Sequence, residues 1–187
     1  MMKLLKNRKI AILITIVVII FATLFGVGRS LNRLSREAEA LFYDGIFLEN
    51  TGQPQRSIEH HLRVLEQASL DISSIFAIHP PLSDESEALM MARRELIDAN
   101  SIPEKYSAYK NVQKASAAFL RKAENDDLTE DDREPIEQYQ TTFSGVVSAI
   151  QRSEYNERAI GFMDEASIIA KFLKPFAFVT SPQTFGT

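Results

Sequence analysis

Hydrophobic residues form one unbroken run near the amino terminus, and beyond it they recur at helical spacing. The run, IAILITIVVIIFATLFGV, covers residues 10–27 and contains no charged residue. As a helix it spans about 27 Å, close to the hydrocarbon thickness of a bilayer. A single segment satisfies its own backbone groups in lipid only as a helix. The run therefore predicts one transmembrane helix that anchors the chain in a lipid bilayer.

A cleaved signal peptide and a buried core helix are the alternatives to an anchor. A signal peptide has an apolar core of about 7–15 residues before a small-x-small site. Gly26-Val27-Gly28 fits such a site, but the run is longer than that core and Arg29 follows at once. A core helix needs neighbours that bury it on all sides, and no flanking pattern supplies them. We expect a retained anchor, with cleavage as the open alternative.

Basic residues on both sides of the run predict its orientation. Residues 1–9 carry four of them together with the amino terminus, and three more follow the run before the first acid. Segments rich in Lys and Arg stay on the cytoplasmic side of a membrane. We expect a single-pass protein of the cell membrane with a cytoplasmic basic segment 1–9 and an extracytoplasmic domain.

Beyond the anchor, apolar residues alternate at steps of three and four, the pattern of a helix with one buried face. The first stripe predicts that the anchor helix continues to about Asn50; it comprises Leu31, Leu34, Ala38, Leu41, Gly45 and Leu48. A second helix is predicted to end before His79-Pro80-Pro81, because two prolines forbid its continuation. Its stripe comprises Ile58, Leu62, Leu65, Ser69, Ile72 and Phe76.

Capping residues predict where the later helices begin. Ser83 is the expected N-cap of the third helix and Asp132 that of the last. The Ser101-Ile102-Pro103-Glu104 sequence has the form of a capping box, so it predicts either a restart or a kink. The last helix is expected to reach Lys174, with a polar patch at residues 151–158 inside it.

Together these stripes predict an all-α protein, in which a single N-terminal transmembrane helix is followed by an elongated antiparallel four-helix-type bundle over residues 29–174. Only seven Gly and seven Pro occur, which suits long helices. Residues 175–187 form a Phe-containing C-terminal tail. We expect this tail to strap back across the bundle or to touch the membrane surface.

Charge and composition narrow the function classes. The seven basic residues of segment 1–36 have no acidic counterpart, so residues 37–187 carry a net charge of −11. Such a surface repels phosphate backbones, and we expect no nucleic-acid partner. The absence of cysteine excludes disulfides, thiolate nucleophiles and iron–sulfur clusters.

No residue pattern predicts a catalytic, cofactor or metal site. His60 and His61 point about 100° apart on a helix, so they do not easily share a metal, and His79 stands apart. The acidic run 124–132 lacks the glycine and the spacing of a calcium loop, and we interpret it as a solvated loop with capping acids. We therefore expect no enzyme activity and no cofactor.

Two short motifs resemble those of the LemA family of membrane-anchored helical proteins. Leu31-Asn32-Arg33-Leu34 is similar to the family's Tyr-Asn-x-Leu, with Leu31 in place of the tyrosine. Ser153-Glu154-Tyr155-Asn156-Glu157 is similar to its Arg-x-x-Tyr-Asn, although Phe162-Met163 replaces a second Tyr-Asn one heptad later. The similarity covers most of the chain. It implies a four-helix antiparallel fold and a role in envelope-associated interaction or signalling.

Residues of these motifs form the candidate site, a possible recognition or register patch of Asn32, Leu34, Tyr155 and Asn156. Tyr155 and Asn156 interrupt an otherwise apolar helix face. They can recognise a partner, or they can hydrogen-bond across the bundle to groups such as Asn32 and so fix the helix register. The second interpretation is favoured, because buried polar groups must find partners.

The sequence therefore favours a non-enzymatic, membrane-anchored helical module that binds another protein of the membrane or cell envelope. A sensory or small-ligand-binding ectodomain is the alternative. Nine residues before the membrane are too few for a cytoplasmic output, so such a receptor needs a partner protein to signal. An enzyme with an unfamiliar site is the third class. A filled core, an internal cavity and a cleft lined by ionisable groups would distinguish the three.

Overall fold

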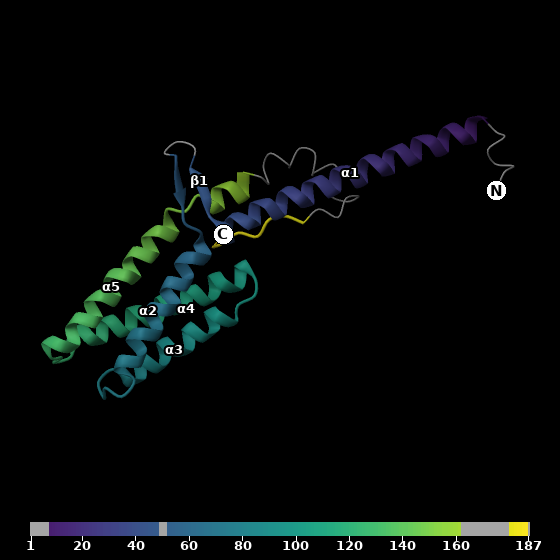
Figure 1. Cartoon of the computed structure of the whole chain (residues 1–187). Coiled ribbons are helices and arrows are strands. Elements are labelled where there is room, and N and C mark those ends of the chain that lie inside the picture. Colours follow the sequence, from purple (N-terminus) through teal and green to yellow (C-terminus); the bar gives the residue numbers. More distant parts are fainter. Residues whose placement is uncertain (1–7, 49–51, 162–179, 187) are drawn as a thin grey trace. The chain divides into compact units, whose positions relative to one another are not determined.

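The computed structural model describes residues 8–48, 52–161 and 180–186. In this part of the chain there are five helices and one short hairpin, which lies between α1 and α2 in the sequence (Figure 1). The helices are α1 (Arg8–Asp44), α2 (Ile58–Phe76), α3 (Ser83–Asp98), α4 (Ile102–Asn125) and α5 (Glu130–Gln151). The hairpin pairs β1 (Ile46–Leu48) with β2 (Gln53–Gln55) in antiparallel register. The predicted all-α class is confirmed, and the hairpin is an addition to it.

The described residues fall into two compact units. Unit 1 comprises residues 8–39, 158–161 and 180–182, and unit 2 comprises residues 40–48, 52–157 and 183–186. Helix α1 therefore supplies most of unit 1 and, with its last turn, a small part of unit 2.

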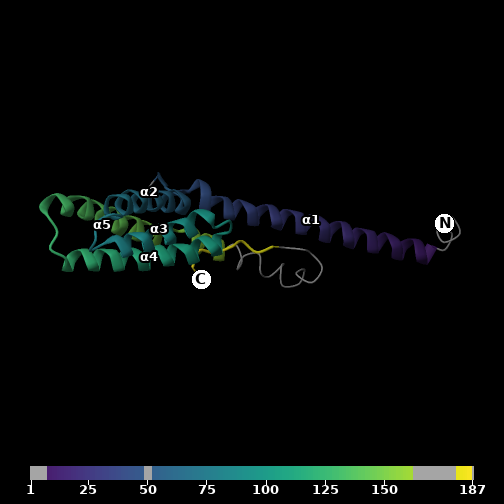
Figure 2. The ribbon, with the colours of Figure 1, turned by 90° about the horizontal axis from the view of Figure 1, so that it is seen from below.

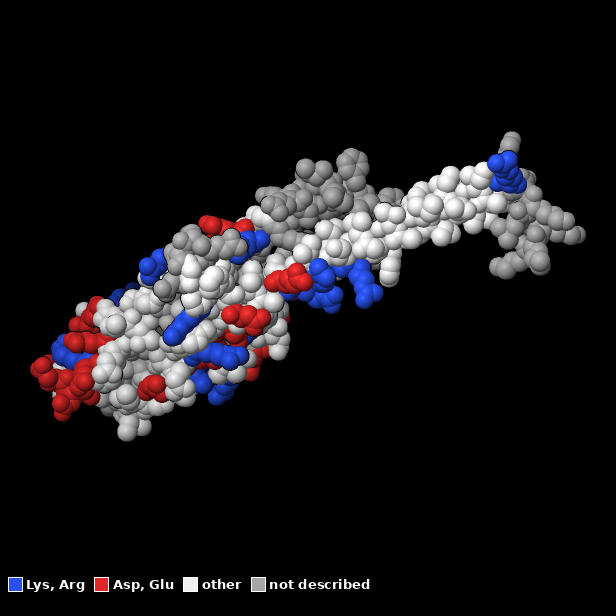
Figure 3. All heavy atoms as spheres, turned by 45° about the horizontal axis from the view of Figure 1, so that its top comes forward, with Lys and Arg blue, Asp and Glu red and all other residues white. Residues whose placement is uncertain are grey.

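The apolar part of α1 in unit 1 has the character of a membrane helix. Its side chains are exposed, with Leu13 at 64% and Phe25 at 75%, and its most apolar window has a mean hydropathy of 3.0. The hydroxyls of Thr15 and Thr23 donate to the carbonyls of Ala11 and Ile19, so neither needs water. In Figure 3 this apolar part of α1 is white, without blue or red side chains. The helix is long and apolar enough to cross a bilayer, as an anchor or as a signal sequence.

Gly45 ends α1 six residues earlier than the predicted end at Asn50, so that prediction is wrong. Its φ of +86° is the left-handed conformation that glycine adopts at helix C-termini. A Cβ at this position would lie 2.5 Å from the Gln55 carbonyl oxygen of the hairpin. The chain then alternates as a strand does, with Ile46 buried and Phe47 exposed at 63%.

Unit 2 is built around α2 to α5, which run side by side in both ribbon views (Figures 1 and 2). Helix α3 packs on α2 and α4, and α5 packs on α2. The predicted α2 stripe is buried from Ile58 to Phe76. On α4, residues at the same spacing are buried from Tyr109 to Ala123. The helical period therefore identified the core correctly, and the side chains of these stripes fill the space between the helices.

Two of the three predicted caps are wrong, and one is confirmed. The Ser101 hydroxyl accepts from the Glu104 amide, and the Glu104 carboxylate accepts from the Ser101 amide, so α4 is a restarted helix. Ser83 is instead the first residue of α3, after the buried Leu82. Thr129 caps α5, because Asp132 stands three residues further on and completes that capping box.

The last helix is not continuous, so the prediction of one helix to Lys174 is wrong. Helix α5 ends at Gln151, and the chain becomes helical again at Tyr155 after a turn. The Gln55 side chain bonds the break from both sides: its Nε2 donates to the Arg152 carbonyl and its Oε1 accepts from the Glu154 amide, each at 3.3 Å. The predicted polar patch coincides with this break. Residues 162–174 lie outside the described residues.

Candidate functional site

The segment Gln183–Gly186 is the C-terminal part of unit 2 and inserts the Phe185 ring among three aromatic side chains of that unit. Phe42, Tyr106 and Tyr109, which we call the Phe185 cage, have ring centroids 5.6, 5.1 and 5.6 Å from that ring. Only 4% of Phe185 is exposed. Tilted and edge-on ring pairs at these separations are favourable beyond the apolar area that they bury.

Local structure explains why the cage forms here. Phe42 stands in the last turn of α1, three residues before Gly45 ends that helix. Tyr106 and Tyr109 are three residues apart on α4, so they share a face of that helix. Tyr155 supports Phe42 from behind, with ring centroids 5.5 Å apart and only 1% of Tyr155 exposed.

Two side chains of the predicted recognition patch hold the segment by its backbone. The Asn156 amide accepts from the Phe185 N–H at 2.8 Å and donates to the Phe185 carbonyl at 2.6 Å. The Tyr155 hydroxyl donates to the Gln183 carbonyl at 2.6 Å. Backbone bonds of this kind hold any extended peptide, and the side chains then decide which peptide fits.

Gln183 and Gly186 add sequence requirements to these backbone bonds. The side-chain oxygen Oε1 of Gln183 accepts a hydrogen bond from the Ile102 amide at 3.1 Å. Ile102 is in the first turn of α4, where backbone N–H groups have no acceptor within the helix. Gly186 has a φ of +96°, and a Cβ there would meet the Tyr106 ring at 2.5 Å. The site therefore makes specific contacts with the Gln183 side chain, the Phe185 ring and the glycine at 186.

A groove continues beside the cage, with a volume of about 310 Å³. Its lining includes Tyr106, Lys110, Gln113, Ser153, Glu157 and Phe185. One side of the groove is formed by residues at and after the polar break that follows α5, Ser153 and Glu157 among them. Figure 3 shows acidic side chains elsewhere, over the turn that leads from α4 to α5, where Glu130 and Asp131 lie.

Asn32 and Leu34 lie in unit 1. The Asn32 side-chain oxygen accepts from the Thr180 amide at 2.8 Å and from the Thr180 hydroxyl at 3.1 Å. Leu34 is 40% exposed. In unit 1, Asn32 of the first motif therefore hydrogen-bonds Thr180. In unit 2, Tyr155 and Asn156 of the second motif hydrogen-bond residues 183 and 185. The sequence analysis did not name Gln183, Phe185 or Thr180 as partners of these residues.

Tyr109 makes the stability of the folded state depend on pH in the alkaline range. Burial, with a smaller effect from Tyr106, raises the Tyr109 pKa from 10.0 to about 12. The folded state therefore favours the neutral phenol, and its stability falls as pH rises from 10 towards 12. We expect Tyr109→Phe to lessen this fall, measured by urea unfolding at pH 8 and pH 11. Equal falls in the variant and the wild type would contradict the assignment.

A second polar cluster lies inside the bundle and joins three helices. The Tyr139 hydroxyl of α5 hydrogen-bonds Ser116 of α4 and lies 3.4 Å from the Ser69 hydroxyl of α2. All three residues are buried, and burial raises the Tyr139 pKa. Buried hydroxyls of this kind are stable only when they bond one another.

Tyr139→Phe should lower the free energy of unfolding by about 1 kcal/mol, because Ser69 and Ser116 lose their shared partner. Urea denaturation of the full chain measures this change. Tyr43→Phe is the matched control, since Tyr43 is 46% exposed, and we expect it to stay within about 0.5 kcal/mol of the wild type. Equal stabilities of the two variants would show that the cluster does not contribute.

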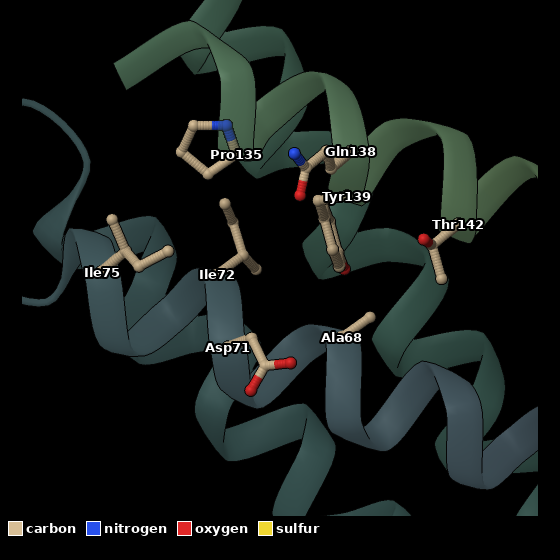
Figure 4. Close-up of a pocket in the computed structure, with 8 residues that line it drawn as sticks. All are labelled: Ala68, Asp71, Ile72, Ile75, Pro135, Gln138, Tyr139 and Thr142. Atoms are coloured by element: carbon tan, nitrogen blue, oxygen red, sulfur yellow. The ribbon is translucent and has the colours of Figure 1, made fainter. Parts of the chain in front are cut away.

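A small cleft lies on the outer side of Tyr139, between α2 and α5 (Figure 4). In this view, Ile72 and Ile75 of α2 face Pro135 and Tyr139 of α5. The cleft has a volume of about 150 Å³. Sites for small ligands usually offer about 300–1,000 Å³, so this cleft is too small for a bound metabolite of ordinary size.

The histidines and the acidic run meet at a single described pair, His79 with Asp132. His60 and His61 have ring centroids 5.6 Å apart, and the Arg56 guanidinium lies 2.9 Å from His60 Nε2. Burial, the His60 ring and Arg56 all lower the His61 pKa. His79 lies 3.6 Å from Asp132. In the described ranges, no three His, Asp or Glu side chains are grouped closely enough to hold a metal.

Comparison of the chain with protein families, with curated proteins and with solved structures finds no match.

Proposed function

We propose that this chain is a membrane-anchored, non-enzymatic interaction module of the cell envelope. The observation that carries the proposal is the way unit 2 holds the segment Gln183–Gly186. An aromatic cage buries one side chain, and Tyr155 and Asn156 bond the backbone on either side of it. This combination of backbone bonds and a side-chain pocket is how proteins recognise extended peptides.

The chemistry of the site suits binding better than catalysis. Its polar contacts come from a phenol, two carboxamides and a backbone amide, and the cage itself is aromatic. These groups donate and accept hydrogen bonds without changing protonation at neutral pH. A general acid or base, in contrast, needs a pKa close to the working pH.

The exposed apolar helix supports the membrane part of the proposal. Its most apolar window is 0% buried, and lipid is the solvent that suits such a surface. The positive charges before it favour a cytoplasmic amino terminus and an external unit 2. We further propose that the chain is a divergent member of the LemA family, because both motifs of the resemblance bond segment 180–186.

Cysteine labelling tests the proposed location. The chain has no cysteine, so Glu124→Cys on the exposed surface of α4 creates a single label site. We expect a membrane-impermeant maleimide to label this variant in intact cells. Labelling only after permeabilisation would show that unit 2 lies in the cytoplasm. Recovery of the protein in the soluble fraction would show that the apolar helix does not anchor the chain.

Crosslinking in intact membranes, followed by mass spectrometry, tests the interaction role. We expect the wild type to be recovered with an envelope protein and Asn156→Asp to lose it, because a second carboxylate oxygen would face the Phe185 carbonyl. Asn125→Asp is the control, since the Asn125 side chain is exposed and bonds only the local Arg121 carbonyl. Recovery of the wild type alone, under conditions that capture known complexes, would overturn the proposal.

A further inference from the structure

We infer that Arg29, Arg33 and Arg36 form a binding site for the headgroup phosphates of anionic phospholipids, at the end of the apolar helix from which the rest of the chain continues. We call these three residues the arginine stripe. The inference rests on the proposed function in one respect, because it assumes that the apolar helix stands in a bilayer. It deepens that function by naming the lipid chemistry that surrounds the anchor.

The three arginines share one exposed face of α1 in unit 1. They stand at positions i, i+4 and i+7, which a helix places within about 60° of one another. All three side chains are exposed. Figure 3 shows basic side chains on one side of α1, directly after its white apolar part. One turn nearer to the amino terminus the same face presents Phe25, which is 75% exposed. An apolar surface and a basic surface therefore adjoin on this face.

The stripe stands at the depth of the lipid headgroups. At helical rise, Arg29 lies about 3 Å beyond Val27 and Arg33 about 9 Å. The headgroup layer on each side of the hydrocarbon is about 5–8 Å thick. Side chains on a helix lean towards its amino terminus, which is the bilayer side here. Arg36 leans in this way, because its Nε donates to the Asn32 carbonyl at 3.3 Å, one turn nearer to the apolar run.

The acidic residues nearby leave the stripe able to bind a phosphate. In the described ranges Arg29 forms no ion pair, and Arg33 Nε pairs with Glu37 Oε1 at 3.3 Å. The two side chains of that pair are 71% and 58% exposed, and exposed pairs of this kind contribute little to stability. A guanidinium holds a phosphate through two parallel hydrogen bonds, which are stronger. A lipid phosphate can therefore displace Glu37 from Arg33.

An anionic lipid is the occupant that the position of the stripe favours. The chain carries a net charge of −4, so its average charge repels anionic lipids. The stripe reverses this effect locally, because each basic residue close to an anionic membrane surface favours binding about fivefold. A dissolved phosphate has no acyl chains to hold it beside Phe25. We therefore expect the stripe to enrich anionic lipids around a protein that is acidic as a whole.

Quenching of a single tryptophan by brominated lipids tests the inference in the full-length chain. The chain has no tryptophan, so Phe25→Trp introduces one reporter, a turn before Arg29. The protein is placed in vesicles of phosphatidylglycerol and phosphatidylcholine, and one lipid at a time carries bromine on its acyl chains. Titration of the brominated fraction gives the relative binding constant of the two lipids at this end of the helix. We expect phosphatidylglycerol to be preferred at least about fivefold.

Variants in the Phe25→Trp background assign this preference to the stripe. Replacement of all three arginines of the stripe with Gln should abolish the preference, while continued quenching by phosphatidylcholine verifies insertion. Glu37→Gln should raise the preference about twofold, because Arg33 loses its competing partner. Arg63→Gln is the matched control. It removes the same charge and the same kind of exposed pair, with Glu59 on α2, and should leave the preference unchanged.

The outcomes separate this inference from the proposed function. Equal quenching by the two lipids, with the stripe intact, would overturn the lipid site and leave the anchor in place. Quenching by neither lipid would show that the apolar helix is not in the bilayer, and would overturn both. If Arg63→Gln lowered the preference as much as the triple replacement, overall charge and not the stripe would be its cause. Loss of the preference on addition of inorganic phosphate, at constant ionic strength, would overturn the lipid as the occupant.

Discussion

Phe185→Ala should release the segment Gln183–Gly186 from unit 2. The ring is almost fully buried among Phe42, Tyr106 and Tyr109, and Phe-to-Ala changes in such sites cost about 3–5 kcal/mol. At the lower end of that range the docked population falls about 100-fold. Hydrogen exchange of the residue 185 amide, which donates to Asn156, should therefore accelerate by about that factor in the full-length chain.

The same measurement should report on the Ile102 amide, whose acceptor is the Gln183 side chain. Phe47→Ala is the matched control, because Phe47 is 63% exposed and unit 2 gains little from it. We expect the control to leave both amides as they are in the wild type. If Phe185→Ala left the exchange of both amides unchanged, the segment would not be held by its ring, and the cage would lose its proposed role.

Gly45→Ala should destabilise unit 2 by about 2–3 kcal/mol. The residue has a φ of +86°, which costs an L-residue about 1 kcal/mol or more. The added methyl would also lie 2.5 Å from the Gln55 carbonyl and 3.1 Å from the Ser57 amide. Both contacts are with backbone, so the hairpin must move. Guanidinium denaturation, followed by far-UV circular dichroism, measures the loss.

Gly145→Ala is the control for this substitution and should have the opposite sign. Gly145 lies inside α5, and a Cβ there would meet nothing within 4 Å. Alanine in an exposed helix position is favoured over glycine by about 0.5–1 kcal/mol. Stabilisation by both substitutions would show that the junction after α1 adapts freely. Destabilisation by both would show that the helix face of Gly145 is in contact after all.

The helices of the bundle were predictable because the residues that specify each helix lie close together in the sequence. A stripe such as Ile58, Leu62 and Leu65 can be read from one helix alone, and the structure buries it. The capping box at Ser101 was predictable for the same reason, since it involves residues three apart, but the choice between a restart and a kink was left to the structure. The hairpin was not, because Gly45 and Leu48 continue the spacing of the preceding helix by coincidence. Only the contact with Gln55, distant in sequence, shows why glycine stands at 45.

The candidate site was only half predictable. Tyr155 and Asn156 stood out as polar residues on an apolar face, but their partners lie beyond residue 180. The cage is drawn from Phe42, Tyr106 and Tyr109, and no periodic pattern links positions so far apart. One signal was present in the tail: Phe185 is the phenylalanine that precedes a glycine. Glycine at 186 permits the positive φ and the close approach to Tyr106 that this position requires.

The hydroxyl cluster of Ser69, Ser116 and Tyr139 limits how the bundle can transmit a mechanical signal. One way in which packed helices switch is a ratchet of one element past another by about one turn, and both end points must then satisfy their polar groups. Here a one-turn displacement of α5 would carry the phenol away from both serines and strand three oxygens in a dry interior. The cluster therefore opposes a one-turn slide of α5 along α2 and α4.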